Sequence, residues 1–99
     1  MSKLSQKLKS KEFIITGELE PKLSIDLEPL VKEAETIKKF VDAANITDNP
    51  GSFSRASALA SSIYIKQRSE IDLIYQMTCR DFNRLSVVSN LVSAASFGI

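Results

Sequence analysis

Three apolar segments along this chain each end in polar residues, and these ends recur at a constant interval. The segments cover residues 13–19, 41–47 and 71–77. Near their ends lie Glu18, Thr47 and Gln76, which are separated by 29 and 29 residues. Because an amphipathic segment follows each apolar one, the predicted order is strand, helix, strand, helix, strand, helix. This order is typical of an α/β fold with a parallel sheet and right-handed crossovers.

The length of the repeat favours one particular parallel fold. A βα unit of this length repeated eight times gives about 250 residues, the size of a closed (β/α)8 TIM barrel. The chain has 99 residues, enough for three such units. We therefore predict the first three βα units of a TIM barrel, with the barrel not closed within this chain. Residues 1–12 are a polar lead, and a complete small three-layer domain is the alternative.

Alternation along the strands separates two faces of the predicted sheet. The face expected to carry the polar strand ends is made of Thr16, Glu18, Asn45, Thr47, Gln76 and Thr78. The opposite face is expected to pack under helices, and it includes Phe13 and Ile15. The third helix is expected to bury its apolar side, made of Leu85, Val88, Leu91, Val92 and Ala95.

Glu18 is the candidate for chemistry, since parallel α/β folds place their active sites at the carboxyl ends of the strands. A carboxyl group buried among amides and hydroxyls, with no cation beside it, tends to keep its proton. A general acid requires this property. The alternative is that Glu18 and Glu20 are simply the polar face of an edge strand. Cys79 is interpreted as a small buried or half-buried filler, with a reactive thiol as the other possibility.

Composition excludes several classes of function. Thirteen basic and twelve acidic residues leave a net charge of +1, which gives no broad surface for nucleic acid. With no histidine and one cysteine, no metal site is expected from this chain, and a Ser–His or Cys–His nucleophile is excluded. No apolar run has the length of a membrane span or of a signal peptide core. We therefore expect a cytoplasmic protein that binds neither nucleic acid nor membranes.

Three short motifs at the strand ends are similar to those of one enzyme family. They are Glu18-Leu19-Glu20-Pro21, Asn45-Ile46-Thr47-Asp48 and the run from Gln76 to Arg84, which reads QMTCRDFNR. In order and register over residues 11–99, the chain resembles methylenetetrahydrofolate reductase, in particular the acetogen-type branch with its Q-x-T-C-R-D-x-N-R run. The chain departs from the family at Pro21-Lys22, where a Pro-Pro pair is usual.

The resemblance implies a flavin-dependent barrel that reduces 5,10-methylenetetrahydrofolate to 5-methyltetrahydrofolate. It places the catalytic acid at Glu18 and the contacts to the flavin at Thr47 and Gln76. The implied flavin is FAD rather than FMN, and the implied electron donor is a reduced nicotinamide or another reductant. The implied partners are the rest of the barrel and either a partner subunit or further copies of the chain.

A second hypothesis belongs to another class of function. A sheet that ends in an open strand edge exposes unpaired backbone groups that can pair with another chain. The chain would then be a non-catalytic truncated barrel fragment that acts as an interaction or assembly module.

Overall fold

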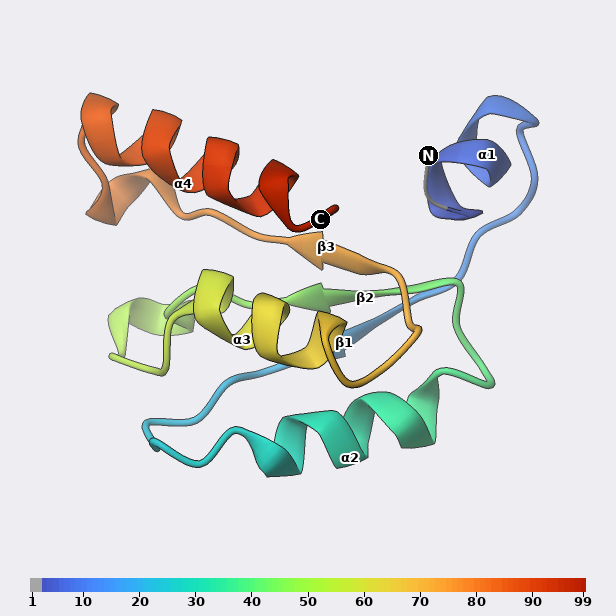
Figure 1. The fold of residues 1–99 in the computed structure, drawn as a ribbon, viewed down its shortest axis with the longest axis horizontal. Helices are drawn as coiled ribbons and strands as arrows, with labels where there is room; N and C mark the ends of the chain where they lie inside the picture. The colour runs from blue at the N-terminus through green and yellow to red at the C-terminus, as the bar shows by residue number, and fades with distance from the viewer. Residues whose placement is uncertain (1–2) are drawn as a thin grey trace.

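Three parallel strands form one sheet in the computed structural model, which describes residues 3–99 (Figure 1). The strands are β1 (Thr16–Leu19), β2 (Ala43–Ile46) and β3 (Leu73–Tyr75), and they pair in the order β1-β2-β3. The helices are α1 (Lys3–Lys9), α2 (Glu28–Ile37), α3 (Ala58–Lys66) and α4 (Arg84–Ser96), with 3-10 turns η1 (Pro50–Ser52) and η2 (Cys79–Asp81). The predicted α/β class and the alternation of strands and helices are confirmed.

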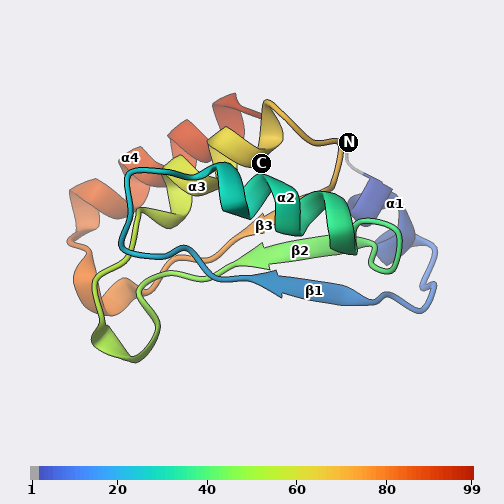
Figure 2. The ribbon, with the colours of Figure 1, turned by 90° about the horizontal axis from the view of Figure 1, so that it is seen from below.

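The three helices that follow the strands lie on one side of the sheet. Figure 2 shows α2, α3 and α4 above the strands and α1 beside the amino ends of the strands. Within residues 3–99 the opposite face of the sheet carries no helix. This arrangement has two layers, not three, and it is consistent with the first βα units of a TIM barrel that stays open.

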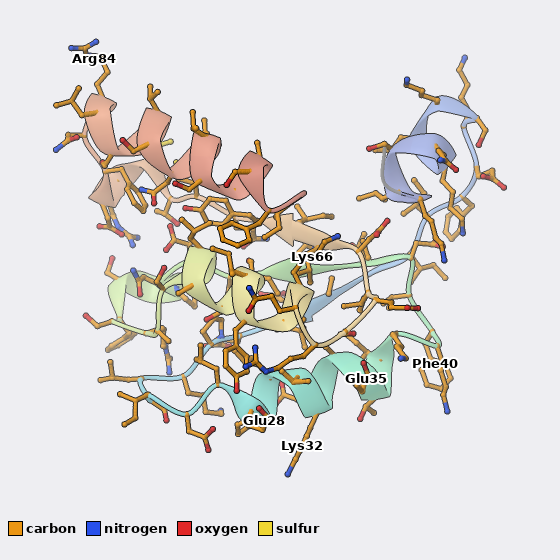
Figure 3. The ribbon with its side chains drawn as sticks, in the orientation of Figure 1. Glu28, Lys32, Glu35, Phe40, Lys66 and Arg84 are labelled. Atoms are coloured by element: carbon orange, nitrogen blue, oxygen red, sulfur yellow. The ribbon has the colours of Figure 1, made fainter. Side chains whose placement is uncertain are left out.

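The core lies between the sheet and helices α2 and α3. Its buried residues are Leu19, Leu30, Val31, Ala34, Ala44, Ile46, Ala58, Ile65 and Ile71. On α2 the apolar residues recur at helical spacing, so one side of the helix packs on the sheet. Lys32 lies on the other side of α2 and points away from the sheet (Figure 3). Full burial of one such leucine or isoleucine contributes about 1.5–3 kcal/mol, so this layer dominates the stability of the fold.

Helix α3 packs against the sheet through small side chains. Ser61 and Ser62 are fully buried together with Ala58 and Ile65. The Ser62 hydroxyl donates to the carbonyl oxygen of Ala58 at 2.7 Å, which satisfies it without a partner from another element. Small residues at these positions let the helix approach the strands closely.

Helix α1 occupies most of the predicted polar lead, whose positions 1 and 2 lie outside the described residues. Two contacts hold it at the amino ends of the strands. The backbone N–H of Leu4 donates to the Asp72 carboxylate at 2.9 Å, and the Lys7 ammonium pairs with Asp42. The Lys7 hydrogen bond lowers the pKa of Asp42, and the pKa of Lys7 is raised in turn.

The first strand is shorter than predicted. It begins at Thr16, so residues 13–15 lie outside the ladder. The N–H of Ile15 donates to the Asp42 carboxylate at 2.9 Å, and a side chain therefore takes the place of a strand carbonyl there. Phe13 is 88% exposed and Ile15 is 50% exposed. The expectation that these two residues pack under helices is wrong.

The expectation that the apolar side of α4 is buried is also wrong. Helix α4 begins with a reciprocal cap in which the side chain of Asn83 accepts from the N–H of Ser86 at 2.9 Å. Its apolar residues are nevertheless exposed, and they are Leu85, Val88, Leu91, Val92 and Ala95. The helix touches α3 through a different side, on which Ala94 is buried. No other described element covers the apolar side of α4, so these residues stay in contact with solvent.

Candidate functional site

The two faces of β1 differ sharply. A Cβ on Gly17 would lie 3.0 Å from Cδ1 of Ile37, which shows that Gly17 faces helix α2. Leu19 is buried on the same side. Because side chains alternate along a strand, Thr16 and Glu18 point away from the helices. Glu18 therefore lies on the open face of the sheet, near the carboxyl end of β1.

Parallel pairing places residues of β2 and β3 on the same open face. Glu18 pairs with Asn45, and Asn45 pairs with Ile74. One further step along this register brings Thr47 level with Gln76, and the Gln76 N–H donates to the Ile46 carbonyl at 3.3 Å. The structure thus brings the strand ends that carry Glu18, Thr47 and Gln76 to one edge of the sheet, as the sequence predicted.

The prediction that the three residues stand at equivalent levels is only half right. Paired residues of β1 and β2 lie 27 positions apart, as in Thr16 with Ala43, but those of β2 and β3 lie 29 apart, as in Ala44 with Leu73. Thr47 is thus level with Gln76, whereas Glu18 stands two residues before that level. Such a stagger between neighbouring strands is what the tilted strands of a barrel require.

Glu18 is exposed, contrary to the expectation of a buried carboxyl group. Its carboxylate has no hydrogen-bond or ion-pair partner among residues 3–99. The reason is that the open face of the sheet has no second layer within these residues. Glu18 is thus free to meet a ligand, and its burial depends on whatever covers this face.

Asn45 links the open faces of β1 and β2. Its amide group donates to the Thr16 hydroxyl at 3.3 Å and to the Gly17 carbonyl at 3.2 Å. These bonds hold the amide beside Glu18 at the centre of the sheet. Asn45 was predicted only to share this face, and its bridge to β1 could not be derived from its type.

Thr47 combines burial with an unused hydroxyl. It is 4% exposed, and its Oγ1 has no hydrogen-bond partner within the described part of the chain. A buried hydroxyl without a partner can form a hydrogen bond to a bound group. The hydroxyl of Ser61 on α3 is also buried and unpaired, so it is the place of Thr47 at the strand ends that points to a ligand. The neighbouring Gln76 is exposed, so its amide is available to a ligand. Together these two residues fit the polar rim of a heteroaromatic ring.

The loops that follow β2 and β3 are tied together by Asp48, a residue to which the sequence assigned no role. Asp48 is 7% exposed, and its carboxylate accepts from the N–H of Thr78 at 2.7 Å. Farther out, Arg80 donates to the Asn49 carbonyl at 3.3 Å. Arg80 also pairs with Asp81, and this hydrogen bond lowers the pKa of Asp81.

A second tie joins the loops that follow β1 and β2. Arg55 lies 3.3 Å from the carboxylate of Glu20, and the N–H of Ala56 donates to the Lys22 carbonyl at 2.9 Å. Glu20 therefore takes part in loop structure. Cys79 is exposed, so its interpretation as a buried or half-buried filler is wrong.

Two further observations concern residues 3–99 as a whole. They contain no group of three or more side chains suited to hold a metal ion. None of the helices formed by these residues has the length and apolar character needed to cross a membrane.

Comparison with known proteins agrees with the resemblance seen at the strand ends. The family model described as methylenetetrahydrofolate reductase matches residues 3–99. No curated protein and no solved structure gives a significant match. Because the family model covers almost the whole chain, including all three strand ends, the chain belongs to the methylenetetrahydrofolate reductase family.

Proposed function

We propose that this chain is the N-terminal part of a single flavin-dependent TIM-barrel reductase domain, with residues 1–99 supplying its first three βα units. The complete domain reduces 5,10-methylenetetrahydrofolate to 5-methyltetrahydrofolate. The flavin is FAD rather than FMN, and the donor is a reduced nicotinamide or another reductant. The remaining βα units, present in the same or a partner chain, close the barrel. Acetogen-type membership and a cytoplasmic location belong to the same proposal.

One observation carries this proposal. In a chain of this family, Glu18, Thr47 and Gln76 lie on neighbouring strand ends at the carboxyl edge of one open sheet face, with Glu18 two residues before the level of the other two. The unpaired hydroxyl of buried Thr47 is the feature that favours a bound flavin. A flavin ring offers the hydrogen-bonding atoms that Thr47 and Gln76 lack, and these two residues would hold it.

Glu18 acts as the general acid in the proposed reaction. Its carboxyl group donates a proton to the nitrogen that leaves when the imidazolidine ring of the substrate opens, and an electrophilic iminium remains. A reduced flavin held by Thr47 and Gln76 would supply the hydride for the iminium carbon. Asn45, which is bonded to β1, keeps a neutral amide beside Glu18 and brings no charge there. The missing barrel units would exclude water from this face and enclose Glu18.

Glu18→Gln in the protein expressed from its full reading frame tests the assignment. We expect the formation of 5-methyltetrahydrofolate to fall at least about 100-fold, since general acids contribute about 10²–10⁴-fold. The reduction of the flavin by the donor should stay within about twofold of wild type, because it needs no proton from Glu18.

Glu20→Gln is the matched control, because it makes the same change two residues away in a half-exposed ion pair. Folate reduction by this variant should stay within about threefold of wild type. Folate turnover near the wild-type rate in Glu18→Gln would show that Glu18 is not the acid.

One observation favours a second candidate function, that of an interaction or assembly module. Leu85, Val88 and Val92 on α4 are each more than half exposed, beside the unpaired edge of β3. Such a surface suits an interaction or assembly module. A colourless 99-residue chain that assembles into dimers or larger species would support this function. A monomeric, folded chain that binds flavin would contradict it.

A further inference from the structure

We propose that Asp48 and Thr78 are positioning residues that set the distance between the ends of β2 and β3, and thereby the fit of the flavin between Thr47 and Gln76. The proposal rests on the proposed function for the flavin, and it adds two residues that act through their neighbours.

The bonds between Asp48 and Thr78 replace one regular step of the sheet. The N–H of Gln76 donates to the Ile46 carbonyl at 3.3 Å and continues the ladder beyond β3. The next step of a parallel ladder would join the N–H of Thr78 to the carbonyl of Asp48. Here the N–H of Thr78 donates to Oδ2 of Asp48 at 2.7 Å, and the Thr78 hydroxyl donates to the Asp48 carbonyl at 3.0 Å. Each of these two hydrogen bonds therefore joins a backbone group of one residue to the side chain of the other, where a regular ladder would join two backbone groups.

These two hydrogen bonds place side-chain atoms between the ends of β2 and β3 and keep the two ends joined. Regular neighbouring strands lie about 4.8 Å apart. At this step a carboxylate and a hydroxyl stand between the two backbones, so side-chain atoms space the strand ends while two hydrogen bonds join them. This step lies directly beyond Thr47 and Gln76, the pair proposed to hold the flavin. A ligand that inserts between strand ends requires a fixed spacing between them.

The two hydrogen bonds between Asp48 and Thr78 are also strong enough to keep the strand ends at a fixed spacing. Asp48 is 7% exposed, and hydrogen bonds to a carboxylate are shorter and about twice as strong as neutral ones. Loss of the carboxylate would leave the N–H of half-buried Thr78 without an acceptor and would weaken the link between the two strand ends. Binding sites need their contact residues held within about 0.5 Å, so a weaker link here would reduce flavin affinity.

Two matched pairs of variants test the proposal in the protein expressed from its full reading frame. Thr78→Val removes the hydroxyl and keeps the shape, whereas Thr78→Ser keeps the hydroxyl. Asp48→Ala removes the acceptor, whereas Asp48→Asn keeps an oxygen for the Thr78 N–H. The readouts are the dissociation constant of FAD from absorbance titration, the thermal midpoint, and the hydrogen exchange rate of the Thr78 amide.

We expect the FAD dissociation constant to rise at least about tenfold in Asp48→Ala and about three- to tenfold in Thr78→Val, the range of one or two lost hydrogen bonds. Thr78→Ser and Asp48→Asn should remain within about threefold of wild type. Exchange of the Thr78 amide should accelerate in Asp48→Ala and stay slow in Asp48→Asn. If Asp48→Ala does not fold, the FAD dissociation constants of Thr78→Val and Thr78→Ser test the proposal by themselves.

Two different failures can be told apart. If wild type binds FAD and Thr78→Val binds it as tightly as Thr78→Ser, the positioning role is wrong, and a lower thermal midpoint alone would mark a purely structural role. If wild type binds no FAD, the proposed function itself is wrong, and this inference is overturned with it.

Discussion

The two faces of the sheet in this chain are opposites in chemistry and in completeness. The face toward α2 and α3 carries Leu19, Ala44 and Ile46, which are at most 2% exposed. The other face carries Thr16, Glu18 and Asn45, which are exposed or half-buried. Within residues 3–99, helices pack on the first face, and no helix covers the second.

This difference separates stability from function. Apolar burial on the helix face supplies the free energy that keeps the strands in place. Thr16 and Glu18 on the open face contribute little burial, whereas Thr47 is buried but its hydroxyl lacks any partner that the described residues could provide. Polar groups that are held rigidly and left unsatisfied are suited to bind a ligand. Substitutions on the two faces should therefore have different consequences.

Ile46→Ala should have the largest effect on stability. Ile46 is fully buried between the sheet and the helices, and truncation leaves a cavity. We expect the free energy of unfolding to fall by about 2–5 kcal/mol, as for other buried isoleucines. Denaturant unfolding measures it. Ile25→Ala is the control, because Ile25 is 105% exposed and its truncation should cost less than about 0.5 kcal/mol. Equal losses in both variants would show that burial under the helices does not determine the cost of truncation.

Neighbouring residues of β1 provide a smaller and sharper comparison. Gly17→Ala places a Cβ 3.0 Å from Cδ1 of Ile37 and 3.3 Å from Cγ1 of Val41, so these side chains must give way by a few tenths of an ångström. Overpacking of this kind costs about 1–3 kcal/mol. Glu18→Ala, one residue along, removes a carboxylate without a partner and should change stability by less than about 0.5 kcal/mol. Thermal unfolding of both variants checks this order, and the reverse order would mean that the faces are assigned incorrectly.

The sequence alone was sufficient to predict the features that depend on residues close together in the chain. The alternation of strands and helices, the apolar stripe of α2 and the cap at Asn83 all follow from residue types at short spacing. Gly98, which follows α4, has a positive φ of 76°, a conformation that glycine adopts readily at the end of a helix. Such features need only a few neighbouring residues to form.

Features that depend on contacts between elements were not predictable. The shift of two residues between β1 and β2 arises from strand tilt, to which a repeat of 29 residues gives no clue. The exposure of Leu85 and Phe13 depends on which elements cover them, and apolar character alone cannot reveal that. The bond between Asp48 and Thr78 joins residues 30 positions apart and forms only once the strands are paired.

Hydrogen exchange of backbone amides, with and without bound FAD, tests the central claim that the open face carries the site. In the protein expressed from its full reading frame, we predict slower exchange on FAD binding in residues 18–20, 45–49 and 76–79. Exchange in α2, residues 28–37, should not change. Protection confined to α2 and α3, or no protection in any of the strand ends of a protein that binds FAD, would contradict the account.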